Sequence, residues 1–491
     1  QECSMSSFET GVQLFKKLLM KQKNMDAYFA NEEDALHRAF PAKATVHSGP
    51  FGIPMLWSTA RNYLEKKSHE PRRKEALAYV HIPFCESRCL FCMFYQNPWT
   101  ADASERYCRN LIREFALWSG RPAQNSAPIK ALYFGGGTPT ALPPQQLKEL
   151  LIAAKKYLPL SDDCEITVEG RVHNMTDEML EASLEGGVNR FSFGVQSFDA
   201  KIRKEMQRID TPERVIRRLE EIAANRQAAV VIDLLFGFPG QKGTAWESDL
   251  KIASELPIDG VDCYQLNVFE KSPLNKRIQA GLLEPAATLA EAADMFARSV
   301  EVFSAHGEWR RLTNTHWART ARERNIYNSL AKGSLDCLPF GCGAGGKLSG
   351  HSWMQERKLS KWNEMVEKDQ KPVFVMMKPQ ENWYLLRTLA SSVESGPFSL
   401  KAIGEAFGVE IEKPLKPVTD QWIRAGLLEK KDDLFIPTVA GQFWYVTMAQ
   451  LLTEALTGVL SKGSVRTEDL IEQSVYSPNQ GQAWLDGVPR K

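Results

Sequence analysis

The sequence predicts an α/β protein whose central part is a partial (β/α)6 barrel, with a parallel sheet inside and helices outside. Two observations support this fold class. Between residues 73 and 285, six apolar runs typical of strands alternate with amphipathic stretches typical of helices. Glycine and polar motifs follow these strands directly, at the carboxyl ends where barrels of this type gather their chemistry. We therefore expect a functional site at that end of the barrel.

The six units follow one another closely. The strand-like runs are ALAYVHI, IKALYF, CEITVEG, NRFSFGV, AVVIDLLFGFP and VDCYQLNVF. Helices are expected at 103–119, 144–157, 176–186, 199–206, 211–225 and 244–255. At least one helix separates each strand from the next, as crossover connections between parallel strands require.

Three further parts flank the barrel. Residues 1–72 predict an N-terminal helical extension, which ends in the charged stretch EKKSHEPRRKE. Residues 286–375 begin with a helix and contain the Gly-rich run PFGCGAGGKLSGHSWM, which we expect to be a loop that covers the substrate. Residues 376–491 predict a mainly helical, winged-helix-like domain with a short hairpin at LLEKKDDLFIPT.

Composition excludes several classes of protein. The 61 basic and 60 acidic residues give a net charge of +1, which argues against a nucleic-acid or anionic-membrane partner. The chain has no run of about 18 apolar residues, and its N-terminus lacks the apolar core of a signal peptide. Nine cysteines, an odd number, indicate reduced thiols. We expect a cytoplasmic monomer.

The strongest chemical signal is a loop with three cysteines behind the first strand. Cys85, Cys89 and Cys92 have the spacing C-x3-C-x2-C. Three thiolates bind three irons of a [4Fe–4S] cluster and leave the fourth iron open, so that it can chelate S-adenosylmethionine (SAM). The alternative is a zinc site or unligated thiols, but zinc motifs usually pair C-x2-C with a second such pair, which the chain lacks.

The second signal is the run Gly135-Gly136-Gly137-Thr138-Pro139-Thr140, directly after the strand ALYF. Consecutive glycines permit a close approach of the backbone, whose N–H and C=O groups bind the amino-acid end of a ligand. That ligand would be SAM. A tight turn between strand and helix is the alternative.

Polar side chains near the ends of apolar strands are the third signal. Buried polar groups are costly unless a ligand or a partner satisfies them. Such groups point to a ligand, or alternatively to an internal salt-bridge network of Arg208, Asp233 and Glu169. The residues are Glu169, Gln196, Arg208 and Asp233.

Residues 77–270 resemble the HemN-like branch of the radical SAM proteins, with YVHIPFCxxxCxFC, GGGTPT, Glu169, GVQSFD, Arg208 and DLLFGFPGQ in the family order. The resemblance implies cluster ligation by Cys85, Cys89 and Cys92 and two bound SAM molecules. The first SAM would contact Tyr79, Phe91, Gly136 and Glu169. The second would contact Gly137, Thr138, Gln196, Arg208, Asp233 and Asn267. Catalytic roles would fall to Tyr79, Gln196, Arg208 and Asp233.

Departures from the motifs select among three functions on this branch. Phe94 replaces the fourth cysteine of oxygen-independent coproporphyrinogen III oxidase, and the HNxxYW element of the haem chaperones is matched only by NTHW at 314–317 and ERNIYNSL at 323–330. In contrast, FCMFYQNPW, RERNIYNSL and the Gly-rich run resemble the ChuW/HutW group, which comprises anaerobic haem-degrading, anaerobilin synthase-like radical SAM methyltransferases. Met93 is a small departure, since members often have Gly there.

This resemblance implies an enzyme that opens the haem macrocycle anaerobically, gives a methylated linear tetrapyrrole and frees iron. It would need a one-electron donor such as a flavodoxin or a flavin reductase. Candidate axial ligands of haem are His316 and His351, and candidate propionate partners are Arg310, Arg311 and Arg319, although such residues are more often structural. The alternatives are a haem-binding chaperone and a coproporphyrinogen III oxidase.

Overall fold

The computed structural model describes residues 25–45, 52–72 and 74–461. They form two compact units. The barrel unit comprises the described residues from Gly52 to Trp383. The second unit combines residues 25–45 with residues 384–461. The structure therefore groups the chain differently from the four predicted segments, because the predicted N-terminal extension is divided between the two units.

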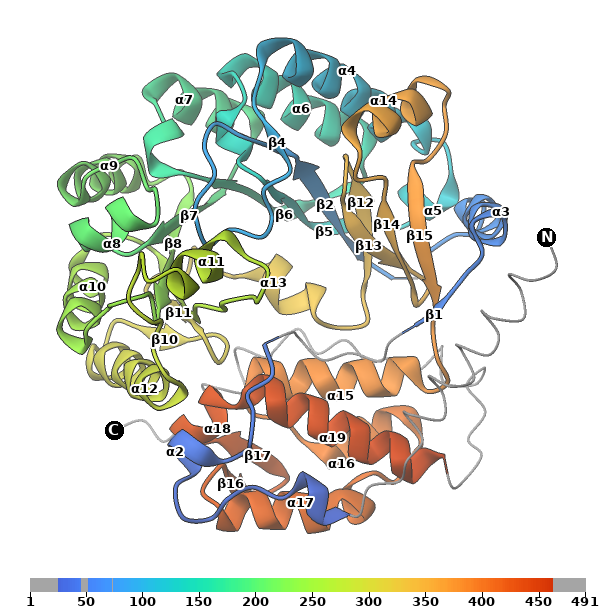
Figure 1. Cartoon of the computed structure of the whole chain (residues 1–491). Helices are drawn as coiled ribbons and strands as arrows, with labels where there is room; N and C mark the ends of the chain where they lie inside the picture. Colours follow the sequence, from blue (N-terminus) through green and yellow to red (C-terminus); the bar gives the residue numbers. More distant parts are fainter. Residues whose placement is uncertain (1–24, 46–51, 73, 462–491) are drawn as a thin grey trace. The chain divides into compact units, whose positions relative to one another are not determined.

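The barrel unit is built on a 13-stranded sheet whose centre is parallel (Figure 1). The six predicted strands are present in chain order, and each pairs in parallel with the next. They are β2 (Ala76–Ile82), β5 (Ile129–Gly136), β6 (Leu160–Gly170), β7 (Arg190–Gln196), β8 (Ala229–Phe236) and β9 (Gly260–Gln265). The sheet curves, with its helices on the outside, which confirms the predicted fold class.

The outer helices lie within two residues of the predicted bounds. They are α4 (Ala101–Leu117), α6 (Pro144–Tyr157), α7 (Asp177–Gly186), α8 (Ala200–Glu205), α9 (Pro212–Ala224), α10 (Gly243–Glu255) and α12 (Leu289–Ala305). Several begin at a side-chain cap that satisfies a free backbone N–H of the first turn. At α12, Thr288 and Glu291 form a reciprocal capping box. Such local signals explain why these helices were predictable.

The Gly-rich run does not form the expected loop. It contributes to β12 (Asp336–Phe340), β13 (Gly345–Leu348) and β14 (His351–Gln355), and β12 pairs in parallel with β2. The sheet continues antiparallel through β13, β14, β15 (Val373–Lys378) and the edge strand β1 (Ile53–Pro54). A Cβ atom at Gly346 would lie 2.4 Å from the Cys337 carbonyl oxygen. The glycine thus allows close strand packing, and this part of the run is strand rather than loop.

The opposite edge of the sheet is also antiparallel. There, β11 (His316–Ala318) pairs with β9, and β10 (Arg310–Arg311) pairs with β11. The remaining short elements of the unit are α3 (Trp57–Ser68), β3 (Phe84–Cys85), β4 (Asn97–Pro98), α5 (Pro122–Asn125), η2 (Pro139–Ala141), η3 (Val172–Asn174), α11 (Pro273–Gln279), α13 (Ile326–Ala331) and α14 (Leu359–Glu367).

The second unit is mainly helical and contains the predicted hairpin. Its elements are η1 (Met25–Tyr28), α2 (Ala35–Arg38), α15 (Trp383–Ser395), α16 (Leu400–Phe407), α17 (Glu412–Arg424), β16 (Leu428–Lys431), β17 (Leu434–Pro437), α18 (Val439–Phe443) and α19 (Tyr445–Leu460). The indole N–H of Trp422 donates to the Tyr28 carbonyl at 2.9 Å, and that of Trp444 donates to the Ala35 carbonyl at 2.9 Å. Residues 25–45 are therefore part of this unit. None of the helices in the described ranges is long and apolar enough to cross a membrane.

Candidate active site

The cysteine loop, residues 85–94, starts at the end of β3 and carries all three predicted ligands. Cys85 and Cys89 are buried and Cys92 is partly exposed. Each sulfur accepts a hydrogen bond: Cys85 from the Thr138 hydroxyl at 3.4 Å and Cys92 from the Phe94 N–H at 3.3 Å. Cys89 accepts from two guanidinium groups, those of Arg171 and Arg208, each at 3.3 Å. Thiolates that bind a metal are typically oriented by hydrogen-bond donors directed at the sulfur, as they are here.

The three thiols face one region without converging on one point. Among the described residues, no three His, Cys, Asp or Glu side chains are gathered closely enough to hold a single metal ion. In a [4Fe–4S] cluster, however, each thiolate binds a different iron, so the sulfurs need only surround a common space. Burial raises the pKa of the Cys85 thiol, and the nearby Cys89 and Cys92 raise it further. This donor set fits a cluster better than a single ion.

The glycine run packs against the base of the cysteine loop. Gly136 has a φ of 109° and donates its N–H to the Glu169 carboxylate at 3.3 Å. The N–H of Gly137 bonds to the Ile82 carbonyl at 2.8 Å, and a Cβ atom there would lie 2.5 Å from the Phe84 carbonyl oxygen. The turn that was predicted to bind the amino-acid end of a ligand thus also fixes the entry to the cysteine loop.

Three tyrosines form an aromatic wall on the inner face of the sheet. The ring centroids of Tyr133 and Tyr327 are 4.4 Å apart, and Tyr79 stacks on both at 6.2–6.3 Å. Tyr327 comes from α13, which lies within the curve of the sheet in Figure 1. The Tyr133 hydroxyl donates to Glu169 at 2.6 Å. Burial raises the pKa of Glu169, although the hydrogen bonds from Tyr133 and Gly136 favour its charged form.

One predicted ligand-binding residue, Gln196, has a buried polar atom without a hydrogen-bond partner among the described residues. The Gln196 Oε1 atom is buried and makes no hydrogen bond, and its backbone has a φ of 73° at the bulge where β7 ends. Burial raises the pKa of Asp233 well above its usual range, and the neighbouring Asp262 and Glu169 add to this effect. Unsatisfied buried polar groups are rare, so Gln196 fits a polar ligand, and the raised pKa of Asp233 marks a second polar group on the neighbouring strand. Phe91 packs edge-on against Phe238 at 5.7 Å, and Asn267 follows β9.

Arg208 is not part of a network with Asp233 and Glu169. Besides Cys89, its guanidinium contacts the Gly194 carbonyl. It therefore lies between the cysteine loop and the end of β7, close to Gln196. The alternative interpretation of an internal network of Arg208, Asp233 and Glu169 is wrong.

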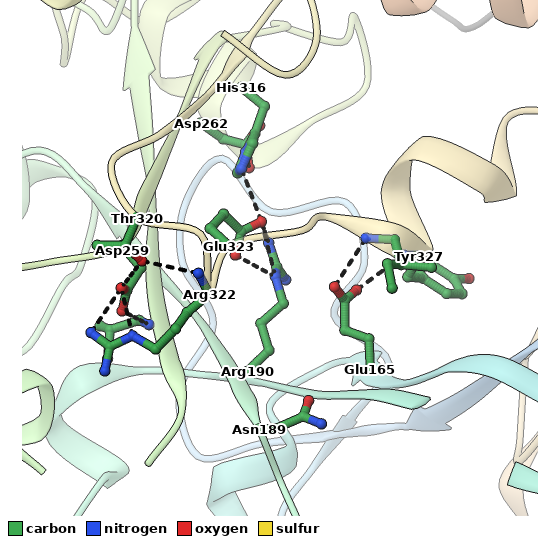
Figure 2. A network of polar contacts seen from close by, with 12 residues as sticks. Glu165, Asn189, Arg190, Asp259, Asp262, His316, Thr320, Arg322, Glu323 and Tyr327 are labelled. Carbon is green, nitrogen blue, oxygen red and sulfur yellow. Dashed lines mark hydrogen bonds and ion pairs between the residues drawn. The ribbon is translucent and has the colours of Figure 1, made fainter. Parts of the chain in front are cut away.

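A different buried network is present, and its members Arg190, Glu323 and Glu165 were not predicted as site residues (Figure 2). Arg190 pairs with Glu323 at 2.9 Å, and His316 lies between Asp262 at 2.7 Å and Glu323 at 3.0 Å. Glu165 accepts the N–H groups of Ile326 and Tyr327, each at 3.0 Å. The network thus fixes α13 and, with it, the aromatic wall. The sequence contains one indication of this network. By strand alternation, the charged residue Arg190 lies on the same inward face of β7 as Ser192, Gly194 and Gln196, so it needs a buried partner.

This network corrects the predicted haem contacts. His316 is fully buried with both ring nitrogens facing carboxylates, so it is not placed to bind haem iron. Two of the candidate propionate partners have protein partners, since Arg310 donates to the Glu323 carbonyl and Arg319 pairs with Glu308. The buried guanidinium of Arg311 lies 4.2 Å over the Trp317 ring. The ring of His351 stacks on Tyr63, whose hydroxyl lies 2.9 Å from its Nδ1 atom.

Comparison with known proteins agrees with this geometry. The model of the radical SAM superfamily matches residues 79–252. Anaerobilin synthase from Escherichia coli O157:H7 is 41% identical over 410 residues, which cover 83% of this chain and 90% of that protein. The chain belongs to the anaerobilin synthase family.

More distant relatives share the same fold. The heme chaperone HemW of Bacillus subtilis is 30% identical over 274 residues, or 56% of this chain and 71% of that protein. The structure of coproporphyrinogen III oxidase (HemN) from Escherichia coli aligns with a TM-score of 0.67 and 19% identity over 79% of this chain and 92% of that chain. This member of the anaerobilin synthase family is therefore a radical SAM enzyme, with a [4Fe–4S] cluster and SAM as its cofactors.

Proposed function

We propose that this protein is a radical SAM C-methyltransferase that opens the haem macrocycle anaerobically, gives a methylated linear tetrapyrrole and releases iron. The observation that carries this proposal is the identity of 41% with anaerobilin synthase over 83% of the chain. The matched length exceeds the part that is shared with the radical SAM superfamily in general. It therefore extends well beyond the radical SAM domain.

The residues at the carboxyl ends of the strands would divide the work of binding. Cys85, Cys89 and Cys92 would hold the cluster, which together with SAM supplies carbon-centred radical chemistry when bound. Tyr79, Phe91, Gly136 and Glu169 would hold the first SAM. Their placement around the glycine turn and the aromatic wall supports this assignment, since all four come from β2, β5, β6 or the cysteine loop.

The second SAM, the methyl donor, would lie on the other side of the turn. Its contacts would be Gly137, Thr138, Gln196, Arg208, Asp233 and Asn267. The Oε1 atom of Gln196 can accept a hydrogen bond, and burial raises the pKa of Asp233, which favours the neutral form that can donate one. Tyr79, Gln196, Arg208 and Asp233 would orient the reactants and exclude water, because the cofactors supply the chemistry itself.

The reaction would also need an electron donor and an anaerobic compartment. The enzyme would take single electrons from a flavodoxin or a flavin reductase and act as a monomer in the cytoplasm. A haem-binding chaperone is the second candidate function, because the match to HemW covers 71% of that protein. A coproporphyrinogen III oxidase is less consistent with Phe94 at the position of that family's fourth cysteine.

One anaerobic assay distinguishes these functions. Cluster-loaded protein would be incubated with SAM, haem and a strong reductant while the Soret band is followed and products are identified by mass spectrometry. Loss of the band with formation of a linear tetrapyrrole, 5′-deoxyadenosine and S-adenosylhomocysteine is expected. An intact Soret band with haem recovered unchanged would contradict the proposal and favour the chaperone. The same assay with coproporphyrinogen III tests the oxidase, and the Cys85→Ala/Cys89→Ala/Cys92→Ala variant is the control.

A further inference from the structure

The connection between β6 and α7 holds the cysteine loop through one arginine. Arg171 directly follows the end of β6, and its guanidinium donates to the Ser87 hydroxyl at 2.7 Å and to the Ser87 carbonyl at 2.7 Å. It also donates to the Cys89 sulfur at 3.3 Å. Three hydrogen bonds from one planar fork thus fix the backbone and the thiol of the same loop segment. Such a geometry is available to arginine and not to lysine.

The next residues of this connection extend the contact. Asn174 donates to the Glu86 carboxylate at 2.9 Å, and a ring nitrogen of His173 lies 3.2 Å from the same oxygen. Burial opposes ionisation of Glu86, but the hydrogen bonds from Asn174 and His173 outweigh it and lower the pKa of this carboxyl. Residues 171–174 therefore hold three positions of the cysteine loop: 86, 87 and 89.

The donors to the three sulfurs differ in charge. Cys85 and Cys92 accept from a neutral hydroxyl and a backbone N–H, whereas Cys89 accepts from two guanidinium groups. Hydrogen bonds and positive charge at a ligating sulfur stabilise the additional electron of a reduced cluster and raise its reduction potential. Of the two arginines, Arg208 also contacts the end of β7, whereas the described side-chain contacts of Arg171 are all with the cysteine loop.

We propose that Arg171 is a positioning residue of the iron–sulfur cluster, which fixes residues 87–89 and raises the reduction potential through its hydrogen bond to the Cys89 sulfur. The cluster would thereby accept an electron from a weaker donor than it otherwise requires. Arg171 lies outside the residues that were predicted from the sequence. The inference concerns reduction of the cluster and does not depend on haem being the substrate.

The first test is the reduction potential of the cluster in the full-length protein without haem. It would be measured by anaerobic redox titration followed by electron paramagnetic resonance. In Arg171→Met, the equilibrium constant for reduction is expected to fall about tenfold, which is about 59 mV for one electron. In Arg171→Lys, which retains the charge but not the fork, a smaller fall is expected. Arg88→Gln is the control, because Arg88 lies in the same loop but is exposed and faces the Tyr95 ring.

The second test does not require the cluster. Amide hydrogen exchange of residues 86–92 in the cluster-free protein is expected to be about tenfold faster in both Arg171 variants and unchanged in Arg88→Gln, because hydrogen bonds that hold the loop are lost. An unchanged exchange rate in Arg171→Met and Arg171→Lys would overturn the positioning role. An equal change of potential in Arg88→Gln and Arg171→Met would overturn the role of the hydrogen bond, since it would show a general effect of charge.

Discussion

At the residue scale, the buried network of Arg190, Glu323, His316 and Asp262 dominates the base of the active site. Arg190 and Glu323 are almost completely inaccessible to solvent, and their side-chain exposures are 2% and 0%. Charges in such surroundings are stable only as a complete set, because each isolated charge carries a large desolvation penalty. The network is therefore expected to be intolerant of single substitutions.

Substitution of Glu323 tests this expectation. Glu323→Gln leaves Arg190 without its buried partner, so the free energy of unfolding is expected to fall by about 3–5 kcal/mol. Chemical denaturation followed by circular dichroism measures the change. Lys368→Gln serves as the control, because it removes a charge from an exposed helical pair with Glu364 and is expected to leave the transition unchanged. A similarly small effect of Glu323→Gln would show that the network is not a stabilising unit.

The same network predicts a pH dependence. Burial alone would lower the pKa of His316, but Asp262 and Glu323 raise it to about 9. Because this value exceeds the ~6.5 of an unfolded histidine, the stabilisation is complete below about pH 6.5 and is lost as the pH rises through about 9. The urea midpoint should therefore fall between pH 6.5 and 9.5 in the wild type and fall less in His316→Gln. Equal slopes in the two proteins would exclude a charged His316.

Residue-level prediction draws on motifs. Spacing and place after a strand single out the three cysteines, Gly136 and Glu169, and the structure brings Gly136 and Glu169 into hydrogen-bond contact. Arg171 and Glu323 could not be found in this way, because their partners, Ser87 and Arg190, are 84 and 133 residues away. Isolated polar residues carry no local signal for such a pairing. His316 illustrates the reverse error, since a histidine suggested a ligand although two distant carboxylates surround it.

At the scale of elements, the turn between β5 and η2 and the cysteine loop depend on each other. Gly137→Ala would place a methyl group against the Phe84 and Ile82 carbonyl oxygens, which belong to backbone that cannot move independently of the loop. We expect cluster incorporation to fall severalfold and the protein to lose about 1–3 kcal/mol of stability. Iron and sulfide analysis after reconstitution and a denaturation curve measure the two effects. Gly120→Ala is the matched control, because nothing lies within 4 Å of its added methyl group.

The helices and parallel strands of the barrel were predictable from local periodicity and caps, whereas β12 to β15 were not. These strands are short, and glycines lie in β13 and in the turns beside it, where they interrupt the apolar alternation by which strands are recognised. Pairing of β12 with β2, more than 250 residues earlier in the chain, anchors this group of strands to the sheet instead. Tertiary context therefore overrides the weak strand propensity of these residues.

At the scale of the whole molecule, residues 25–45 complete the second unit although they precede the barrel in the sequence. Removal of residues 1–45 would expose the indoles of Trp422 and Trp444, which donate to carbonyl groups of this segment. Calorimetry of the truncated protein should show a lower unfolding temperature for the second unit. The transition of the barrel unit is expected to change less. Loss of cluster absorbance in cluster-loaded protein identifies this transition. An unchanged thermogram would show that the segment is dispensable.

We propose that this member of the anaerobilin synthase family opens haem and transfers a methyl group from SAM to the product. The most direct measurement is mass spectrometry of the tetrapyrrole that forms anaerobically from haem with SAM that carries a trideuterated methyl group. A linear tetrapyrrole that carries deuterium from this methyl group is expected, together with released iron. Recovery of intact haem without the label, in the presence of a reduced cluster and SAM, would contradict this proposal.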